Sequence, residues 1–199
     1  GEGRERGRVY VMEGALGARE DIDDARATWT GEADADYAGG ALAAADLDGD
    51  GYPELLVGAT GADVAYTDAG AVYVVAGGLE GARFLSDATA VLHGHGPSAA
   101  AGTRIAVAGD TDGDGRDDVL VGAPGAESSA LFLLRYVEEG TSPLTEASVR
   151  WLADPADELG RAVAGAGDVD GDGLGDFLAG APGVEGGIGA VYLFSGADY

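Results

Sequence analysis

Three short loops carry acidic side chains at a spacing that could do chemistry. The third loop reads Asp168-Val-Asp-Gly-Asp-Gly-Leu-Gly-Asp176, with carboxylates at loop positions 1, 3, 5 and 9 and glycine at position 6. The first and second loops place acids at the same four positions. The matched carboxylates are Asp46, Asp48, Asp50 and Glu54 in the first loop, Asp110, Asp112, Asp114 and Asp118 in the second, and Asp168, Asp170, Asp172 and Asp176 in the third.

Such clusters of carboxylates are unfavourable without a cation. Two like charges about 4 Å apart repel by about 4 kcal/mol at an effective dielectric constant of about 20. A flexible, all-oxygen donor set favours Ca²⁺, which accepts about 6 to 8 oxygens, over Mg²⁺, which requires a tighter octahedron. Glycine at position 6 allows a sharp turn that points the backbone carbonyl of position 7 inward. Those carbonyls belong to Tyr52, Arg116 and Leu174, so the sequence predicts three calcium sites.

The loops differ from an EF-hand, which begins in the same way. An EF-hand needs a bidentate Glu at position 12 and a helix on each side. Position 12 is Val57, Val121 or Ala179 here, so the site closes at position 9 in a loop that fits a β-hairpin. The alternative for any single loop is an ordinary Asp-Gly turn. Three copies with every acid in place favour the metal site.

The elements that position these loops form a repeat. Asp46, Asp110 and Asp168 are 64 and 58 residues apart, and strand-like apolar runs precede and follow each loop. Two further strand signals follow in each complete unit, which predicts four antiparallel strands per unit. We expect complete units at 41–92 and 103–152, a two-stranded piece at 7–32, and a unit lacking its fourth strand at 161–199.

Self-similar four-stranded units of this length are typical of β-propeller blades, because each unit buries its faces only against its neighbours. A β-solenoid, the alternative, has shorter repeats. The predicted fold is therefore all-β, a partial propeller of about three blades within one domain, 1–199. Since a closed ring takes about four to eight blades, we expect either a longer chain or a second copy to complete it.

Composition excludes several classes of function. Acidic residues number 36 against 11 basic ones, for a formal charge of −25, and a field of this sign repels nucleic acids and anionic membranes. Cysteine is absent, so there are no disulfides and no thiolate sites. No apolar run approaches the roughly 18 residues of a membrane span, so we expect no membrane insertion. The Lys-free, Ala-, Gly-, Asp- and Arg-rich composition is typical of a high-GC bacterium.

The units resemble FG-GAP repeats, the blades of the integrin alpha-subunit β-propeller and of many bacterial secreted or surface proteins. Besides the acidic loops, the resemblance rests on a Gly-Ala-Pro motif, found as Gly58-Ala59-Thr60, Gly122-Ala123-Pro124 and Gly180-Ala181-Pro182. Tyr37-Ala38, Ala101-Gly102 and Leu159-Gly160 occupy the place of its aromatic-Gly part. The resemblance covers essentially the whole chain. It implies a calcium-bearing hairpin in each such blade, on the side opposite the usual ligand-binding loops, and a role in adhesion or recognition outside the cell.

Three functions follow as hypotheses. The first is a calcium-stabilised binding or scaffold module, extracellular or on the cell surface, for an unknown protein or glycan ligand. The second is a non-catalytic or lectin-like part of a secreted hydrolase. The third is a partial propeller that completes its ring as a homo-oligomer.

Catalysis by this chain itself is not expected. His93 and His95 are the only histidines, and their spacing is more typical of a surface turn than of a zinc or catalytic pair. No Gly-x-Ser-x-Gly elbow or phosphate-binding glycine loop is present. Trp29 and Trp151 lie on predicted fourth strands, where we expect them to pack between blades rather than bind sugar.

Overall fold

The computed structural model describes residues 6–12, 14, 21–76, 80–125 and 127–199, and it consists almost wholly of β-strands. The strands are β1 (Arg8–Val11), β2 (Ala27–Thr30), β3 (Ala41–Ala45), β4 (Glu54–Ala59), β5 (Ala71–Val75), β6 (Gly81–Phe84), β7 (Ala90–His93), β8 (Arg104–Gly109), β9 (Asp118–Ala123), β10 (Ser129–Leu134), β11 (Gly140–Pro143), β12 (Val149–Ala153), β13 (Ala162–Gly167), β14 (Asp176–Ala181) and β15 (Ala190–Phe194). The helical elements of the described residues are the single turn α1 (Val184–Gly187) and the 3₁₀ turns η1 (Ile22–Asp24), η2 (Leu85–Asp87), η3 (Leu144–Glu146), η4 (Pro155–Asp157) and η5 (Gly196–Asp198). Residues 13 and 15–20, inside the predicted piece 7–32, lie outside the described residues, as do 77–79 and 126.

The strands form four sheets, which we number along the chain. Sheet 1 has the order β1-β2-β6, sheet 2 β11-β7-β5-β4-β3, sheet 3 β12-β10-β9-β8, and sheet 4 β13-β14-β15. Each acidic loop joins the first two strands of its sheet, β3 to β4, β8 to β9, or β13 to β14, and each pair is antiparallel. The predicted hairpins are therefore present, and so is the third strand of each unit, which pairs antiparallel with the second.

Two short strands were not predicted. β6 and β11 lie in the connections that lead to the outermost strands β7 and β12. Each turns back to pair in parallel with the outermost strand of the preceding sheet, β6 with β2 and β11 with β7. Each connection thus covers the edge of the previous sheet, which would otherwise present unpaired backbone groups.

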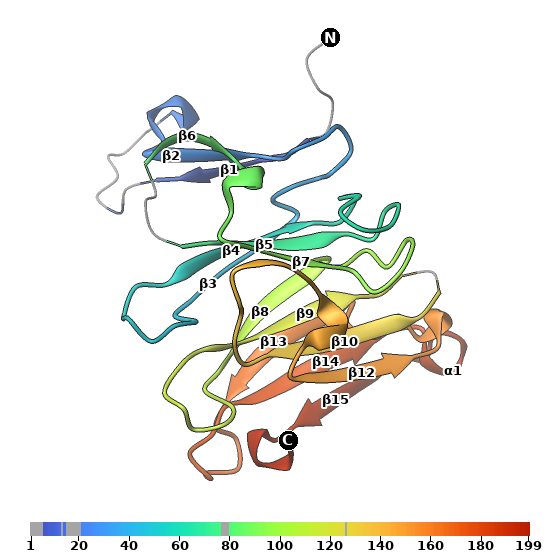
Figure 1. Ribbon diagram of the computed structural model, residues 1–199. Helices are drawn as coiled ribbons and strands as arrows, with labels where there is room; N and C mark the ends of the chain where they lie inside the picture. Colours follow the sequence, from blue (N-terminus) through green and yellow to red (C-terminus); the bar gives the residue numbers. More distant parts are fainter. Residues whose placement is uncertain (1–5, 13, 15–20, 77–79, 126) are drawn as a thin grey trace.

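The sheets are stacked in sequence order, from sheet 1 near the N-terminus to sheet 4 near the C-terminus (Figure 1). A separate apolar core fills each of the three spaces between them. Trp29 packs with Val57 and Tyr73 between sheets 1 and 2. The next two cores are formed by Leu56, Val72, Val74, Val119, Val121 and Phe132 between sheets 2 and 3, and by Leu120, Leu131, Leu133, Phe177 and Ala179 between sheets 3 and 4.

Repeated β-sheets that bury their faces only against their neighbours make this chain a partial β-propeller. Both tryptophans pack as expected: Trp29 is 3% exposed, and Trp151 contacts the rings of Phe177 and Phe194 between sheets 3 and 4. Among the described residues, no helix is long and apolar enough to cross a membrane.

The glycine of the Gly-Ala-Pro motif marks the closest approach of neighbouring sheets. A Cβ atom on Gly58 would lie 2.3 Å from the carbonyl oxygen of Gly102, and one on Gly122 would lie 2.0 Å from that of Gly160. These contacts join the motif of one repeat to the aromatic-Gly position of the next. Glycine is needed here for close packing of two backbones.

Candidate metal centre

The three acidic loops have one backbone scaffold, built by the carboxylate at position 1. In the second loop, Asp110 Oδ1 accepts hydrogen bonds from the backbone N–H groups of Gly113 at 2.6 Å and Asp114 at 3.1 Å, and Oδ2 accepts from Gly115 at 2.9 Å. Asp46 and Asp168 accept from the matching glycines. Burial raises the pKa of Asp110, but its backbone N–H donors outweigh burial and leave that pKa below its usual value.

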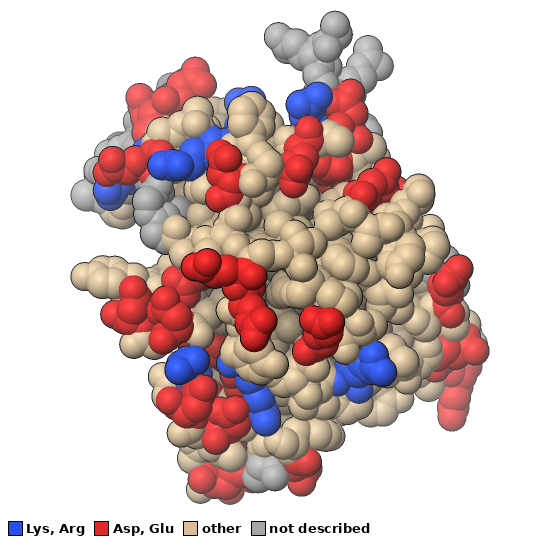
Figure 2. Space-filling view, in the orientation of Figure 1, with Lys and Arg blue, Asp and Glu red and all other residues tan. Residues whose placement is uncertain are grey.

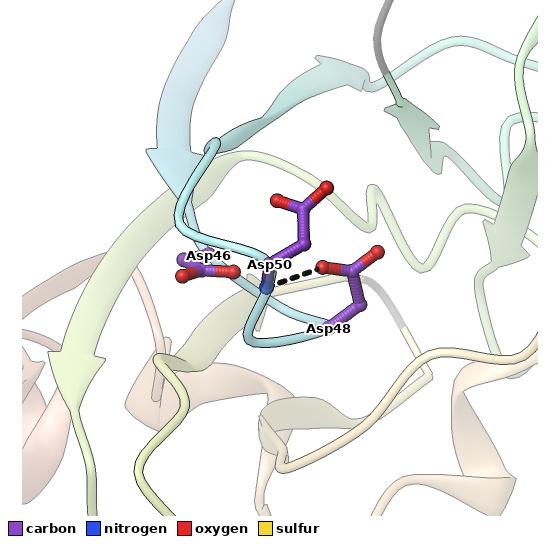
Figure 3. Close-up of side chains that lie close together, drawn as sticks. All are labelled: Asp46, Asp48 and Asp50. Carbon is purple, nitrogen blue, oxygen red and sulfur yellow. Dashed lines mark hydrogen bonds between the residues drawn. The ribbon is translucent and has the colours of Figure 1, made fainter.

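The acids at positions 3 and 5 continue the same pattern. Asp48 Oδ1 accepts from the N–H of Asp50 at 3.0 Å, as Figure 3 shows, and the second and third loops repeat the bond. The position 5 carboxylate then accepts from the N–H of position 7. The three bonds run from Tyr52 to Asp50, from Arg116 to Asp114 and from Leu174 to Asp172.

Glycines at positions 4 and 6 have positive φ in every loop, between 79° and 93°, which side-chain-bearing residues adopt only with strain. The sequence pattern Asp-x-Asp-Gly-Asp-Gly therefore folds one way three times. Its carboxylates are held around the turn by the backbone itself.

The position 9 acid lies at the start of the second strand of each hairpin, and its side chain connects this strand to the beginning of the loop. Its side chain accepts from the N–H of position 2 in each copy, at 2.9 Å for Glu54 and Leu47, 2.8 Å for Asp118 and Thr111, and 2.7 Å for Asp176 and Val169. Asp118 and Asp176 are fully buried and Glu54 is 7% exposed.

The pKa values of these position 9 acids differ. Burial raises the pKa of Asp118 to about 6 and also raises that of Glu54. By contrast, the backbone N–H of Val169 leads the donors that hold the pKa of Asp176 below its usual value. Burial without sufficient donors therefore disfavours the charged form in the second loop most strongly.

The second loop contains an oxygen that calls for a cation. Asp118 Oδ2 accepts from both the N–H and the hydroxyl of Thr111, but Oδ1 is buried and meets no donor among the described residues. A buried, unpaired carboxylate oxygen is costly, and coordination to a hard cation satisfies it. The donor set, all carboxylate and carbonyl oxygen, is the one that Ca²⁺ or Mg²⁺ takes.

Three acids in each loop offer oxygens that all lie within 4.8 Å of one another: Asp46, Asp48 and Asp50; Asp110, Asp112 and Asp118; and Asp168, Asp170 and Asp176. The predicted ligands Glu54, Asp114 and Asp172 lie in the same loops but outside these closest groups. The side chain of Tyr52 is 76% exposed, and position 7 was predicted to contribute only its carbonyl.

The loops are also linked to one another in series. The backbone N–H of Asp117 donates to the carbonyl of Asp46 at 3.0 Å, and the N–H of Asp46 donates to the Asp117 carboxylate at 3.1 Å. The N–H of Gly175 donates to the carbonyl of Asp110 at 2.6 Å. Position 8 of one loop thus holds position 1 of the loop before it. The three loops lie on one side of the stack in Figure 1, and Figure 2 shows acidic side chains on that side as well as on other parts of this face.

The two histidines do not form a site together. His93 Nδ1 lies 3.0 Å from the carbonyl of Gly94, whereas His95 Nε2 lies 2.7 Å from the Ser128 hydroxyl and its ring packs on Phe132. Burial lowers the pKa of His95. Each ring is engaged with its own local partners.

Comparison with known proteins decides the family. The profile of the FG-GAP repeat matches residues 38–75, 101–134 and 159–194, which together make up more than half of the chain. This chain belongs to the FG-GAP repeat family. Each match runs from the aromatic-Gly position through the acidic loop to the third strand of a sheet, so the family pattern coincides with the hairpins described above.

Integrin alpha subunits are among the relatives of this FG-GAP repeat protein. It is 31% identical to integrin alpha-PS5 of Drosophila melanogaster over 82% of this chain, and 32% identical to integrin alpha-5 of Xenopus laevis over 79%. A shorter stretch, 44% of this chain, is 42% identical to integrin alpha-3 of Mus musculus. The chain spans only 16% of the length of the first two relatives.

Proposed function

We propose that this FG-GAP repeat chain is an extracellular recognition or scaffold module whose blades are held in shape by three structural calcium ions. The main support for calcium binding is the acidic loop. It occurs three times with the same hydrogen bonds, and in each copy the oxygens of three acids lie within 4.8 Å of one another. The unpaired buried oxygen of Asp118 supports a cation in particular. Similarity to integrin alpha subunits supports adhesion or recognition of a protein or glycan outside the cell.

The proposed ligands of each ion are the acids at positions 1, 3, 5 and 9 and the carbonyl of position 7. The proposed blades are those predicted from the repeat, 41–92 and 103–152 complete, 7–32 and 161–199 partial. Calcium sites of the extracellular kind have dissociation constants of about 10⁻⁴ to 10⁻³ M, so they fill outside a cell and stay largely empty in the cytosol. In this proposal calcium has a structural role, because each ion stabilises the loop of one hairpin.

Thermal unfolding in calcium and in chelator tests this function. With a dissociation constant of about 10⁻⁴ M and calcium at about 1 mM, each filled site raises the midpoint by about 4 °C. Asp170→Ala removes one converging carboxylate of the third loop, so it should reduce the calcium-induced shift by at least about a third. Asp23→Ala, an exposed acid of η1, is the matched control and should leave the shift intact. Equal midpoints with calcium and with chelator would contradict the proposal.

A second candidate, self-assembly, is favoured by the outer face of sheet 4. Leu131 and Leu133 of β10 are fully buried against sheet 4, whereas the equivalent residues of β15, Val191 and Leu193, are 74% and 58% exposed. In sheets 2 and 3 this face packs on the next sheet. We propose that in the chain printed here the corresponding face of sheet 4 packs against a sheet of a second copy.

Light scattering coupled to size-exclusion chromatography tests the assembly. We expect a dimer in calcium, and we expect Val191→Asp to give a monomer because a carboxylate would be buried in the interface. Val64→Asp, in the exposed β4–β5 connection, is the control and should remain dimeric. A monomeric wild-type chain at micromolar concentration would rule this candidate out.

A further inference from the structure

The residue that follows the third strand of each unit lies beside the position 3 acid of that unit's loop. The three residues are Ala76 after β5, Arg135 after β10 and Ser195 after β15. Their equivalence is fixed by strand register and by a shared hydrogen bond, in which the N–H of Ala76 and of Arg135 donates to the hydroxyl of Thr89 and of Ser148. The same structural position is therefore occupied by an apolar, a positively charged and a hydroxyl side chain in three otherwise matching units.

Arg135 places a fixed positive charge at the second loop. Its Nε lies 3.7 Å from Asp112 Oδ2 and donates to the Thr111 hydroxyl at 3.3 Å, and another guanidinium nitrogen donates to the Thr111 carbonyl at 3.4 Å. A further bond, 2.9 Å long, reaches the carbonyl of Tyr199. The Arg135 side chain is only 16% exposed, so water and salt screen its charge weakly.

The other two loops have no cation at this place. Ser195 donates its hydroxyl to Asp170 Oδ2 at 3.1 Å, which is a neutral contact. Ala76 leaves an open cavity of about 200 Å³ beside the first loop, lined by Asp48, Glu54 and Glu139 among others. At this position the first loop thus faces additional negative charge where the second loop faces a guanidinium. The Arg116 side chain lies between these two loops, beside Gly49 of the first and 3.8 Å from Asp114 of the second.

We propose that Arg135 is an affinity-determining residue that makes the second loop the weakest of the three cation sites. The inference rests on the proposed function, since it requires that the second loop bind a cation. In the absence of the ion, Arg135 neutralises part of the acidic cluster through Asp112. When a cation binds, the guanidinium repels it, and the repulsion grows with the charge of the ion. Arg135 therefore stabilises the empty loop and opposes the filled one.

Site-resolved NMR titration separates the three loops in one sample. The backbone amides of Gly51, Gly115 and Gly173 occupy position 6 of the first, second and third loops, and each donates to its position 1 carboxylate, so each reports on its own loop. Titrating Ca²⁺ and then La³⁺ compares ions of charge two and three. We expect Gly115 to reach half-saturation at the highest Ca²⁺ concentration of the three.

Arg135→Gln removes the charge but keeps hydrogen-bonding capacity. The substitution should lower the ion concentration that half-saturates the second loop, as reported by Gly115, about tenfold for Ca²⁺ and about thirtyfold for La³⁺. The two factors differ because the repulsion scales with the charge of the ion. Gly51 and Gly173 should change a few-fold at most. Arg135→Lys keeps the charge and should resemble the wild type, and Arg150→Gln, on the exposed surface of β12 in the same sheet, is the matched control. In chelator, Arg135→Gln should lower the thermal midpoint.

A purely structural role for Arg135 predicts the opposite binding result. The inference would be overturned if the ion concentration at half-saturation of Gly115 were unchanged or higher in Arg135→Gln. It would also be overturned if affinity rose by the same factor for Ca²⁺ and La³⁺. Either result would leave the proposed function intact. A wild-type chain in which none of the three glycine amides responds to either ion would overturn the proposed function, and this inference with it.

Discussion

The carboxylates at positions 1 and 9 of each acidic loop have different surroundings. The position 1 acid accepts several backbone hydrogen bonds, as at Asp110, and these bonds shape the turn. The position 9 acid is buried at the foot of the loop, and in Asp118 one of its oxygens meets no donor among the described residues. In the second loop, the backbone thus holds a buried carboxylate oxygen that meets no donor in the described part of the chain.

Asp118 gives the ion-free protein a distinctive pH dependence. Its pKa of about 6 lies above the value of about 3.9 for an unfolded Asp, so between these pH values the folded state binds more protons than the unfolded state. Its contribution to stability is therefore fully present below about pH 4 and is lost as the pH rises through 6. The loss amounts to about 3 kcal/mol.

The measurement is the thermal midpoint of calcium-free protein against pH, for the wild type and for Asp118→Asn. The variant has no titrating group at this place, so its midpoint lacks this pH dependence. As the pH rises from 4 to 6, the midpoint of the wild type should therefore fall relative to that of the variant. Parallel curves would contradict the burial-driven pKa.

At this scale the sequence predicted the turn of each loop, because acid and glycine types at fixed spacing determine it, whereas the ion ligands stay a prediction. It did not predict the contact between Arg135 and Asp112, which lie far apart along the chain and are brought together by strand pairing. The signal was present as the residue after the third strand, but only the register shows that this residue faces the loop.

Between elements, one glycine per repeat controls how closely two sheets approach. Gly122 has no positive φ, so the need for glycine comes from the neighbouring carbonyl of Gly160 and not from backbone conformation. Its equivalent in sheet 4 is Gly180, which no further sheet of the described residues approaches, and the nearest atom to a Cβ there would be the Cβ of Ala162 at 3.4 Å.

In the monomeric Val191→Asp background, where no second copy covers sheet 4, we therefore expect Gly122→Ala to destabilise the fold by about 3 kcal/mol or more, because two backbones must separate, and Gly180→Ala to cost less than about 1 kcal/mol. Chemical denaturation of the two variants in the same calcium concentration measures both values. Equal losses of free energy of unfolding would show that the sheet-to-sheet contact at Gly122 does not limit packing.

The hairpins and third strands could be predicted since their apolar runs and turn residues are local signals. β6 and β11 could not, because segments such as 140–143 are short, polar and only partly buried, and they become strands only by pairing with another sheet. A repeated pattern follows them, Leu85-Ser-Asp-Ala88 and Leu144-Thr-Glu-Ala147, in which each leucine is fully buried. This pattern is the signal by which the two edge strands could have been found.

Across the whole molecule, the stack of sheets brings all three loops to one side and ties them in series. Positions 117 and 175 hold the backbone of the preceding loop, so the acidic clusters form a single row within a chain of formal charge −25. The repeat in the sequence predicted this arrangement of blades. The hydrogen bonds between loops depend on sheet stacking, which no local pattern encodes.

Calcium stoichiometry tests the central claim most directly. Equilibrium dialysis of the chain against buffered Ca²⁺, up to concentrations well above 10⁻³ M, should reach three ions per chain, one for each acidic loop. The weaker second loop should fill last. A plateau below three ions per chain, or no saturable binding at all, would contradict the account of three loops built by one sequence pattern to hold one ion each.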